Sequence, residues 1–221
     1  AVQHFGFEPM AIADNGDLYG EDADGTGRLL VLDGMGEGVV TYIGQVGDFD
    51  FMNMFNLPDA SERLVIILSV FEGAASFTLL LYTPGGALTS MDVQAGTGTL
   101  WVPRGIIQDT FGDIWAIGTP PRVPASGTIS TVYFWRIVDT GNNPGVADFQ
   151  TVTGMPGLAS SVPQIWGFAA SDNSFVIQWG QGSGLYQYLV KINATGFTVT
   201  TTRDFGSPSL APFYDHSSDQ I

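Results

Sequence analysis

Five short turns along the chain begin with an aspartate and run straight into an apolar, strand-like segment. In chain order these aspartates are Asp14, Asp59, Asp109, Asp172 and Asp215. If the first four turns are equivalent, their carboxylates gather at one end of a repeat fold, where carboxylate and carbonyl oxygens could bind calcium. The alternative is structural, because an aspartate can cap its own turn by accepting a hydrogen bond from the backbone N–H two residues on. We expect the capping role.

A denser acidic segment, residues 21–26, contains Asp22 and Asp24. Its composition suits a calcium loop, but the full D-x-D-x-D-G-x5-E spacing is missing. A solvated loop is the favoured interpretation, and Asp22 and Asp24 are kept as candidate metal ligands. Calcium is the one cofactor that the sequence suggests, since no G-x-G-x-x-G or Walker pattern follows a strand.

Two segments carry candidate ligand-binding residues. Trp101 lies in a predicted connecting segment, so its ring is expected to face outward, where it could stack on a sugar. The tryptophans and tyrosines at strand positions are expected to pack in the core. Three prolines in the insertion 119–127 forbid a regular ladder and predict a projecting loop. The candidates in this loop are Pro120, Pro121 and Arg122.

Asn193-Ala194-Thr195 is a glycosylation sequon at a predicted turn, which is where an acceptor asparagine should lie. Such triplets also arise by chance. The sequon matters only if the protein passes through a eukaryotic secretory pathway.

No catalytic motif is present in the sequence. The chain has 22 acidic residues, but their spacing selects no pair of carboxylates for glycoside hydrolysis. The two histidines, His4 and His216, lie near opposite ends and outside any nucleophile motif. There is no cysteine, which removes disulfides, thiolate nucleophiles and cysteine-ligated zinc. We therefore expect a protein that is not an enzyme.

The charge balance excludes nucleic acid as a partner. Seven lysines and arginines face 22 acidic residues, for a formal net charge of −15. A nucleic-acid-binding surface needs a basic face to neutralise phosphates, and so few basic residues cannot build one. The longest apolar run, residues 64–71, is far shorter than the roughly 20 residues of a membrane-spanning helix. The chain is therefore not expected to span a membrane.

Strand signals cover the chain, and its 29 glycines and 12 prolines supply many turns. Sets of four strands recur at about the 40–50 residues of a propeller blade. We predict an all-β, propeller-like single domain over residues 1–221, with a β-sandwich or jelly roll as the alternative. The four four-stranded repeats span residues 9–49, 50–96, 105–154 and 164–206. Residues 207–221 would form a partial fifth repeat or a cap, so the chain either closes a four-unit ring or belongs to a larger protein.

The first repeat reads Asp14-Asn15-Gly16-Asp17-Leu18-Tyr19-Gly20, then Leu30-Val31-Leu32-Asp33, then Gly38-Val39-Val40-Thr41-Tyr42-Ile43-Gly44. It resembles the blades of bacterial secreted β-propeller repeat proteins, in which a D-x-G-x-L-Y-G turn precedes two strands of this kind. The third repeat keeps part of the pattern, in residues 112–116 and 135–139. The resemblance implies a fold and no particular chemistry, because such repeats host many functions.

Together these observations predict a non-catalytic binding or assembly module, extracellular or on a virion or cell surface. Its expected partner is a carbohydrate, a protein receptor or other copies of itself. Two alternatives remain open: a structural subunit of a surface filament or virion, and a propeller-fold carbohydrate-active enzyme whose carboxylates the sequence does not single out.

Overall fold

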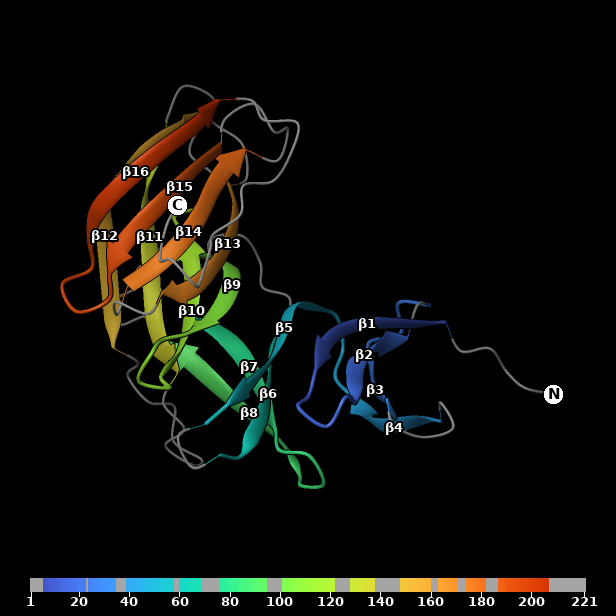
Figure 1. Ribbon diagram of the computed structural model, residues 1–221. Helices are drawn as coiled ribbons and strands as arrows, with labels where there is room; N and C mark the ends of the chain where they lie inside the picture. Colours follow the sequence, from blue (N-terminus) through green and yellow to red (C-terminus); the bar gives the residue numbers. More distant parts are fainter. Residues whose placement is uncertain are drawn as a thin grey trace. The chain divides into compact units, whose positions relative to one another are not determined.

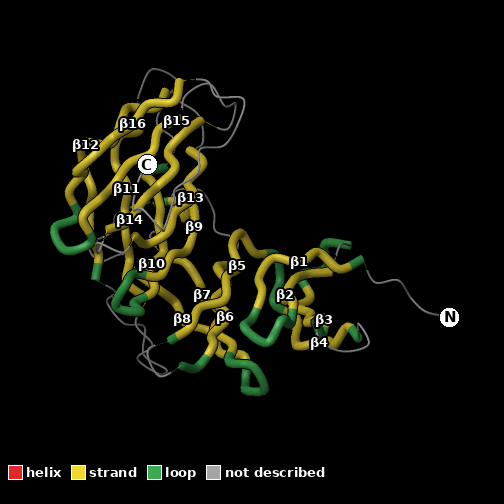
Figure 2. Tube along the Cα trace, viewed as in Figure 1, coloured by secondary structure: helices red, strands yellow, loops and turns green. Residues whose placement is uncertain are grey.

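The regular structure of the protein consists of β-strands (Figure 1). The computed structural model describes residues 6–22, 24–34, 39–57, 60–68, 76–94, 101–121, 128–137, 148–159, 163–170, 174–181 and 187–206. Among these residues Figure 2 shows strands and loops without a helix, so no described helix could cross a membrane. The strands are β1 (Phe7–Ile12), β2 (Leu18–Asp22), β3 (Arg28–Leu32), β4 (Val40–Gln45), β5 (Phe49–Asn56), β6 (Glu62–Leu68), β7 (Ser76–Tyr82), β8 (Leu88–Gln94), β9 (Val102–Gln108), β10 (Ile114–Thr119), β11 (Thr128–Ile137), β12 (Phe149–Ala159), β13 (Pro163–Ala170), β14 (Ser174–Gln181), β15 (Gln187–Asn193) and β16 (Thr198–Gly206).

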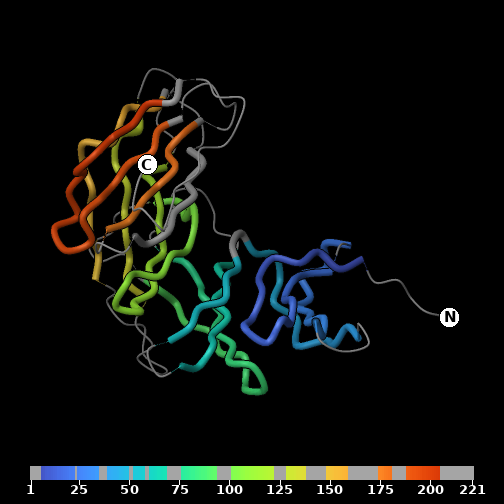
Figure 3. The backbone as a smooth tube through the Cα atoms, in the orientation of Figure 1, coloured from blue at the N-terminus to red at the C-terminus, as the bar shows by residue number. Residues whose placement is uncertain are grey.

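The strands form four sheets, and each sheet is an antiparallel meander of four consecutive strands. Figure 3 shows the same order, because each sheet takes up one continuous stretch of the colour scale. An up-and-down set of four strands is the unit of a propeller blade. The predicted all-β, propeller-like fold class of four four-stranded repeats is therefore confirmed. The sandwich or jelly-roll alternative does not match, since Greek-key connections would place non-consecutive strands side by side within a sheet.

The chain divides into two compact units of two sheets each. The first unit contains the sheets β1–β4 and β5–β8, and the second contains β9–β12 and β13–β16. The partial fifth repeat expected at residues 207–221 lies outside the described residues. That residues 1–221 form a single repeat domain stays a prediction.

Alternating apolar residues build the core of the first unit. Tyr19 and Leu29 project from one face of the sheet β1–β4, and Leu64 and Ile66 project from the sheet β5–β8. All four side chains are almost fully buried. Burying a side chain of this size stabilises the fold by about 1.5–3 kcal/mol. The side-chain period of two along each strand thus decides which face of each sheet enters this core.

Aromatic rings dominate the core of the second unit. Phe134 of β11 stacks on Phe175 of β14 with ring centroids 4.9 Å apart, which joins the two sheets. Trp115 lies edge-on to both phenylalanines, at 6.3 and 6.2 Å. Trp179 is fully buried, and its indole N–H donates to the carbonyl oxygen of Pro156 at 2.7 Å. That bond satisfies the polar atom that burial would otherwise leave without a partner.

Strand β1 runs close to β2 at a β-bulge. The register of the pair shifts between Pro9 and Ala11, and Pro9 lies opposite Gly20. A Cβ atom on Gly20 would lie 2.0 Å from the carbonyl oxygen of Glu8, a distance that real side chains do not adopt. The glycine that ends the D-x-G-x-L-Y-G turn pattern is therefore required by the close approach of β1.

Trp101 is buried, with 1% of its surface exposed. Its ring centroid lies 3.5 Å from that of Trp135, and Trp135 also contacts Tyr133 and Phe149 on the same sheet. The prediction that Trp101 faces outward to stack on a sugar is wrong. The residue lies directly before β9 and forms a β-bridge, so its ring joins an aromatic layer of the sheet β9–β12.

Gly118 makes room for this ring, and we predict that Gly118→Ala destabilises the protein. A Cβ atom at Gly118 would lie 2.0 Å from Cε3 of Trp101. Overpacking of a close-packed site costs about 1–3 kcal/mol, which urea unfolding would detect. The matched control is Gly157→Ala on β12 of the same sheet, where the nearest atom would lie at an ordinary 3.5 Å. Equal stabilities for the two variants would contradict this packing.

Candidate functional site

The carboxylate of Asp109 caps its own turn, as the sequence predicts. Its Oδ1 accepts hydrogen bonds from the backbone N–H groups of Phe111 and Asp113, both at 2.9 Å. Its Oδ2 accepts a third bond, from the indole N–H of Trp115, also at 2.9 Å. The carboxylate thus accepts three hydrogen bonds, and Asp109 connects the β9–β10 turn to a core tryptophan.

The turn aspartate of the first repeat has a different role. By the backbone hydrogen bonds of the two turns, Ala13 takes the position of Asp109, and Asp14 follows it. The cap of that turn is Asn15, whose Oδ1 accepts from the N–H of Asp17 at 3.0 Å. The carboxylate of Asp14 accepts from the side-chain amide of Asn56 at 2.9 Å, and its backbone N–H donates to Glu62. The prediction that Asp14 caps its own turn is wrong, because the side chain of the next residue, Asn15, caps the turn. Asp14 instead connects the first hairpin to the sheet β5–β8 of the same unit.

The candidate metal ligands form no cluster in the described part of the chain. There, no three His, Asp or Glu side chains are grouped so that they could hold a metal ion. Asp24 accepts a hydrogen bond from the N–H two residues on, and Asp22 is bonded to the cation of Arg28. These bonds give both side chains a structural role in the acidic segment, and the calcium prediction receives no support from the described residues. Asp59 and Asp172 lie outside them.

The remaining candidates do not gather at one place. Pro120 and Pro121 follow β10 and are half-buried, while Arg122 lies outside the described residues. Ligand binding by this segment stays a prediction. Asn193 does lie at a turn, and its Oδ1 accepts from the N–H groups two and three residues on, at 2.9 and 2.7 Å. Its glycosylation also stays a prediction.

The sheet β1–β4 presents a second, largely apolar face. Ala11, Tyr19 and Leu29 project into the core shared with β5–β8. Residues that alternate with them project to the opposite side, which we call the distal face. The strand register arranges this face in two rows, since directly paired residues of antiparallel strands share a face. One row is Ile12, Leu18, Leu32 and Val40, and the other is Gly20, Leu30 and Tyr42.

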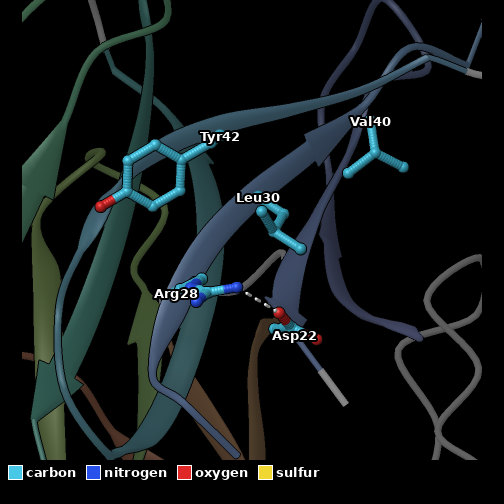
Figure 4. A pocket seen from close by; sticks show the side chains of 5 residues that line it. All are labelled: Asp22, Arg28, Leu30, Val40 and Tyr42. Carbon is cyan, nitrogen blue, oxygen red and sulfur yellow. Dashed lines mark hydrogen bonds and ion pairs between the residues drawn. The ribbon is translucent and has the colours of Figure 1, made fainter. Parts of the chain in front are cut away.

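A cavity of about 310 Å³ lies on the distal face (Figure 4). Its described lining comes from the three strands β2, β3 and β4 alone, so the cavity belongs to the first unit. Leu30 is buried, with 5% of its surface exposed, whereas Tyr42 is 56% exposed. The lining residues are Asp22, Arg28, Leu30, Val40 and Tyr42.

One ion pair supplies the charged groups of this cavity. Nη1 of Arg28 lies 3.2 Å from Oδ2 of Asp22. The Asp22 side chain is only 4% exposed, while that of Arg28 is 40% exposed. A buried carboxylate is costly without a cation or several donors. Arg28 therefore compensates the buried charge of Asp22, and the exposed part of the guanidinium can contact a ligand.

The described lining has the composition of a ligand pocket. It combines apolar side chains with a few polar groups, as ligand pockets do, and its volume falls at the lower end of their range of roughly 300–1,000 Å³. Asp22 is the single acid among the described lining residues, and its partner is a permanent cation. Glycoside hydrolysis needs two carboxylates, one of them able to hold a proton. The described lining does not provide that pair.

Sequence reasoning did not single out Arg28, Leu30, Val40 and Tyr42. The continuous apolar run Leu29-Leu30-Val31-Leu32 indicates a strand with apolar residues on both faces. The signal that was missed is the alternation Arg28, Leu30, Leu32, which places a charge at one end of an apolar row.

Two glutamates lie opposite each other on the strands β1 and β2 of the same sheet. Glu8 of β1 and Glu21 of β2 are paired across the antiparallel strands. Burial, and after it the charges of Glu8 and Asp48, raises the pKa of Glu21 above its usual range. The folded state therefore binds a proton at Glu21 more tightly than the unfolded chain does. This glutamate stabilises the fold when it is protonated, and its contribution is lost as the pH rises through the raised pKa.

Comparison with known proteins finds distant likeness among solved structures. No family model matches the chain, and no curated protein sequence matches it. Among solved structures, a protein from Thermus thermophilus named as an oxidoreductase (glucose dehydrogenase) is similar, with a TM-score of 0.41 and 12% sequence identity. The match covers 92% of this chain and 86% of that one. At this level the likeness carries no argument about what this chain binds or does.

We predict that Arg28→Met lowers stability at neutral pH. The substitution keeps a long apolar stem but leaves the buried Asp22 carboxylate without its cation. Urea unfolding should show a loss of about 1–3 kcal/mol. The same substitution in an Asp22→Asn background should cost clearly less, because the buried group is then neutral. No coupling between the two positions would contradict the role given to this ion pair.

The raised pKa of Glu21 predicts a pH-dependent gain in stability for Glu21→Gln. At neutral pH the variant should be more stable than the wild type by less than about 1 kcal/mol, because it removes a partly buried negative charge that also faces Glu8 across the strands. Below pH of about 4 the gain should vanish, since both chains then carry a neutral side chain at this position. Glu8→Gln should give a gain in the same direction. Thermal unfolding across pH measures all three chains, and a gain that persists in acid would contradict this explanation.

Proposed function

We propose that this chain is a non-catalytic binding or assembly module that acts through the distal face of the sheet β1–β4. The observation that carries the proposal is the apolar cavity of about 310 Å³ on that face, lined by Leu30, Val40 and Tyr42 and bounded by one ion pair. A concave site lined by apolar side chains with a few polar groups is typical of ligand-binding pockets. The partner is a carbohydrate or a protein receptor.

The proposed place of action is outside the cell or on a virion surface. The support is the resemblance of the first repeat to secreted propeller repeats, together with a charged fraction of 13% and a net charge of −15. Such a charge favours solubility and disfavours nucleic acid and anionic membranes as partners.

A structural subunit is the second candidate, and the distribution of exposed apolar residues favours it. Of the large apolar side chains that are exposed in the described part of the chain, Met10, Ile12, Val39 and Tyr42 belong to the first repeat. Phe111 is the exception. Apolar residues gathered on one sheet could pack against a copy of the same chain in a filament or virion. A stable contact of this kind would bury more than about 1,000 Å².

The experiment is a binding screen with matched variants. The wild-type chain is tested on a glycan array and against a panel of surface receptors, beside Val40→Arg and Phe111→Arg. Val40 lines the cavity, whereas Phe111 is 70% exposed in the β9–β10 turn. We expect specific binding that Val40→Arg abolishes and Phe111→Arg leaves unchanged. Thermal unfolding of each variant checks that it is folded.

Three results would overturn parts of this proposal. Silence across both screens, or binding that is indifferent to Val40→Arg, would remove the binding function from this face. Turnover of a bound glycan would replace it with the carbohydrate-active enzyme. A stable oligomer in light scattering that Val40→Arg dissociates would favour the structural subunit.

A further inference from the structure

We infer that the cavity on the distal face binds a neutral carbohydrate, with Tyr42 as the stacking platform and Arg28 as the donor to its hydroxyl groups. The inference rests on the proposed binding function and narrows it to one chemical class. It depends on three properties of the site: an exposed aromatic ring, an ion pair with unused donors, and the overall balance of charge.

Tyr42 provides a flat apolar surface at the rim of the cavity. The side chain is 56% exposed although it lies on a strand, and Leu30 is paired with it across β3 and β4. Val40 stands two residues before it on the same face. Figure 4 shows Leu30 between Tyr42 and Val40, with the ion pair of Arg28 and Asp22 below them. An aromatic ring of this kind can stack on the C–H face of a sugar.

The ion pair supplies directional hydrogen bonds at the end of this platform. A guanidinium carries five N–H donors, and the bond to Asp22 uses Nη1. The Arg28 side chain is 40% exposed, so further N–H groups remain for a ligand. Asp22 fixes the position of the guanidinium, because its carboxylate is buried and cannot follow a moving partner. The donors are therefore already oriented before a ligand arrives.

The charges in and around the cavity select a neutral ligand. An anion would approach Arg28 but would meet the carboxylate of Asp22 and the field of a chain with a net charge of −15. A cation is attracted by the net charge of the chain, but at the cavity it would meet the exposed guanidinium of Arg28, and the carboxylate of Asp22 is already paired. A wholly apolar molecule would remove water from the ion pair and return no hydrogen bond. A sugar has an apolar face for Tyr42 and hydroxyl oxygens that accept from Arg28.

The size of the cavity sets the length of the ligand. About 310 Å³ is at the lower limit for small-molecule sites. We therefore expect one or two sugar rings to enter it, from the end of a glycan rather than from the middle of a long chain.

The test is a ¹⁵N NMR titration of the full chain with neutral disaccharides of glucose, galactose and mannose. Sialyl-lactose and a uronic-acid disaccharide serve as acidic probes. We expect the backbone amides of Leu30 and Tyr42 to shift with at least one neutral probe. Tyr42→Ala should weaken that binding about fivefold to tenfold, the effect of losing one good ring contact. Tyr42→Phe should retain it, and Phe111→Ala, which removes an exposed ring elsewhere, should leave it unchanged.

Different results would contradict carbohydrate binding and the proposed binding function. Shifts with the acidic probes alone, or a neutral sugar whose binding Tyr42→Ala leaves unchanged, would overturn the carbohydrate assignment. So would an absence of shifts with every sugar while the receptor screen shows binding that Val40→Arg abolishes, because a protein would then occupy the face. Shifts that follow protein concentration without any sugar would assign the cavity to a second copy of the chain. Failure of every screen and of every titration would reject the proposed function as well.

Discussion

Apolar side chains on both faces of a four-stranded sheet impose the main constraint on this protein, because each face must be covered to remove it from water. Within each unit, two sheets meet face to face and cover one face of each other. The Leu29 and Ile66 layers meet in the first unit, and the Phe134 and Phe175 rings meet in the second. The distal face of the sheet β1–β4 has the same alternating composition but holds an open cavity. The candidate site is therefore an apolar sheet face that also carries an ion pair.

The sequence predicts the fold well because its determinants are local. Period-two apolar patterns and glycine-rich turns mark four sets of four strands, and the sheets run in that order. Predictions that depend on tertiary contacts were weaker. The segment around Trp101 looks like a connection, yet the absence of a side chain at Gly118 creates the space that buries the ring. Which of two apolar faces stays open depends on neighbouring sheets, so the sequence did not single out Leu30, Val40 and Tyr42 as a site.

The turn aspartates show how one residue type serves different needs at neighbouring positions of similar turns. At Asp109 the carboxylate accepts three hydrogen bonds and connects a turn to the indole of Trp115. In the first repeat Ala13 stands where Asp109 stands in the third. There Asn15 caps the turn, and the carboxylate of Asp14 accepts from Asn56 on the next sheet. In both arrangements the carboxylate accepts a hydrogen bond from another side chain, Asn56 or Trp115. The sequence predicts that each aspartate lies in a turn. The hydrogen-bond partners of its carboxylate oxygens depend on the folded structure.

The bulge in β1 also affects how this sheet can meet another protein chain. Pro9 has no N–H to offer, and the register shift between Pro9 and Ala11 interrupts the regular row of hydrogen-bonding groups on the outermost strand. An incoming strand could not pair along this edge without losing bonds, which is how natural sheets prevent uncontrolled strand addition and fibril growth. The sheet β1–β4 can thus expose an apolar face to water while its edge strand β1 remains a poor template for aggregation.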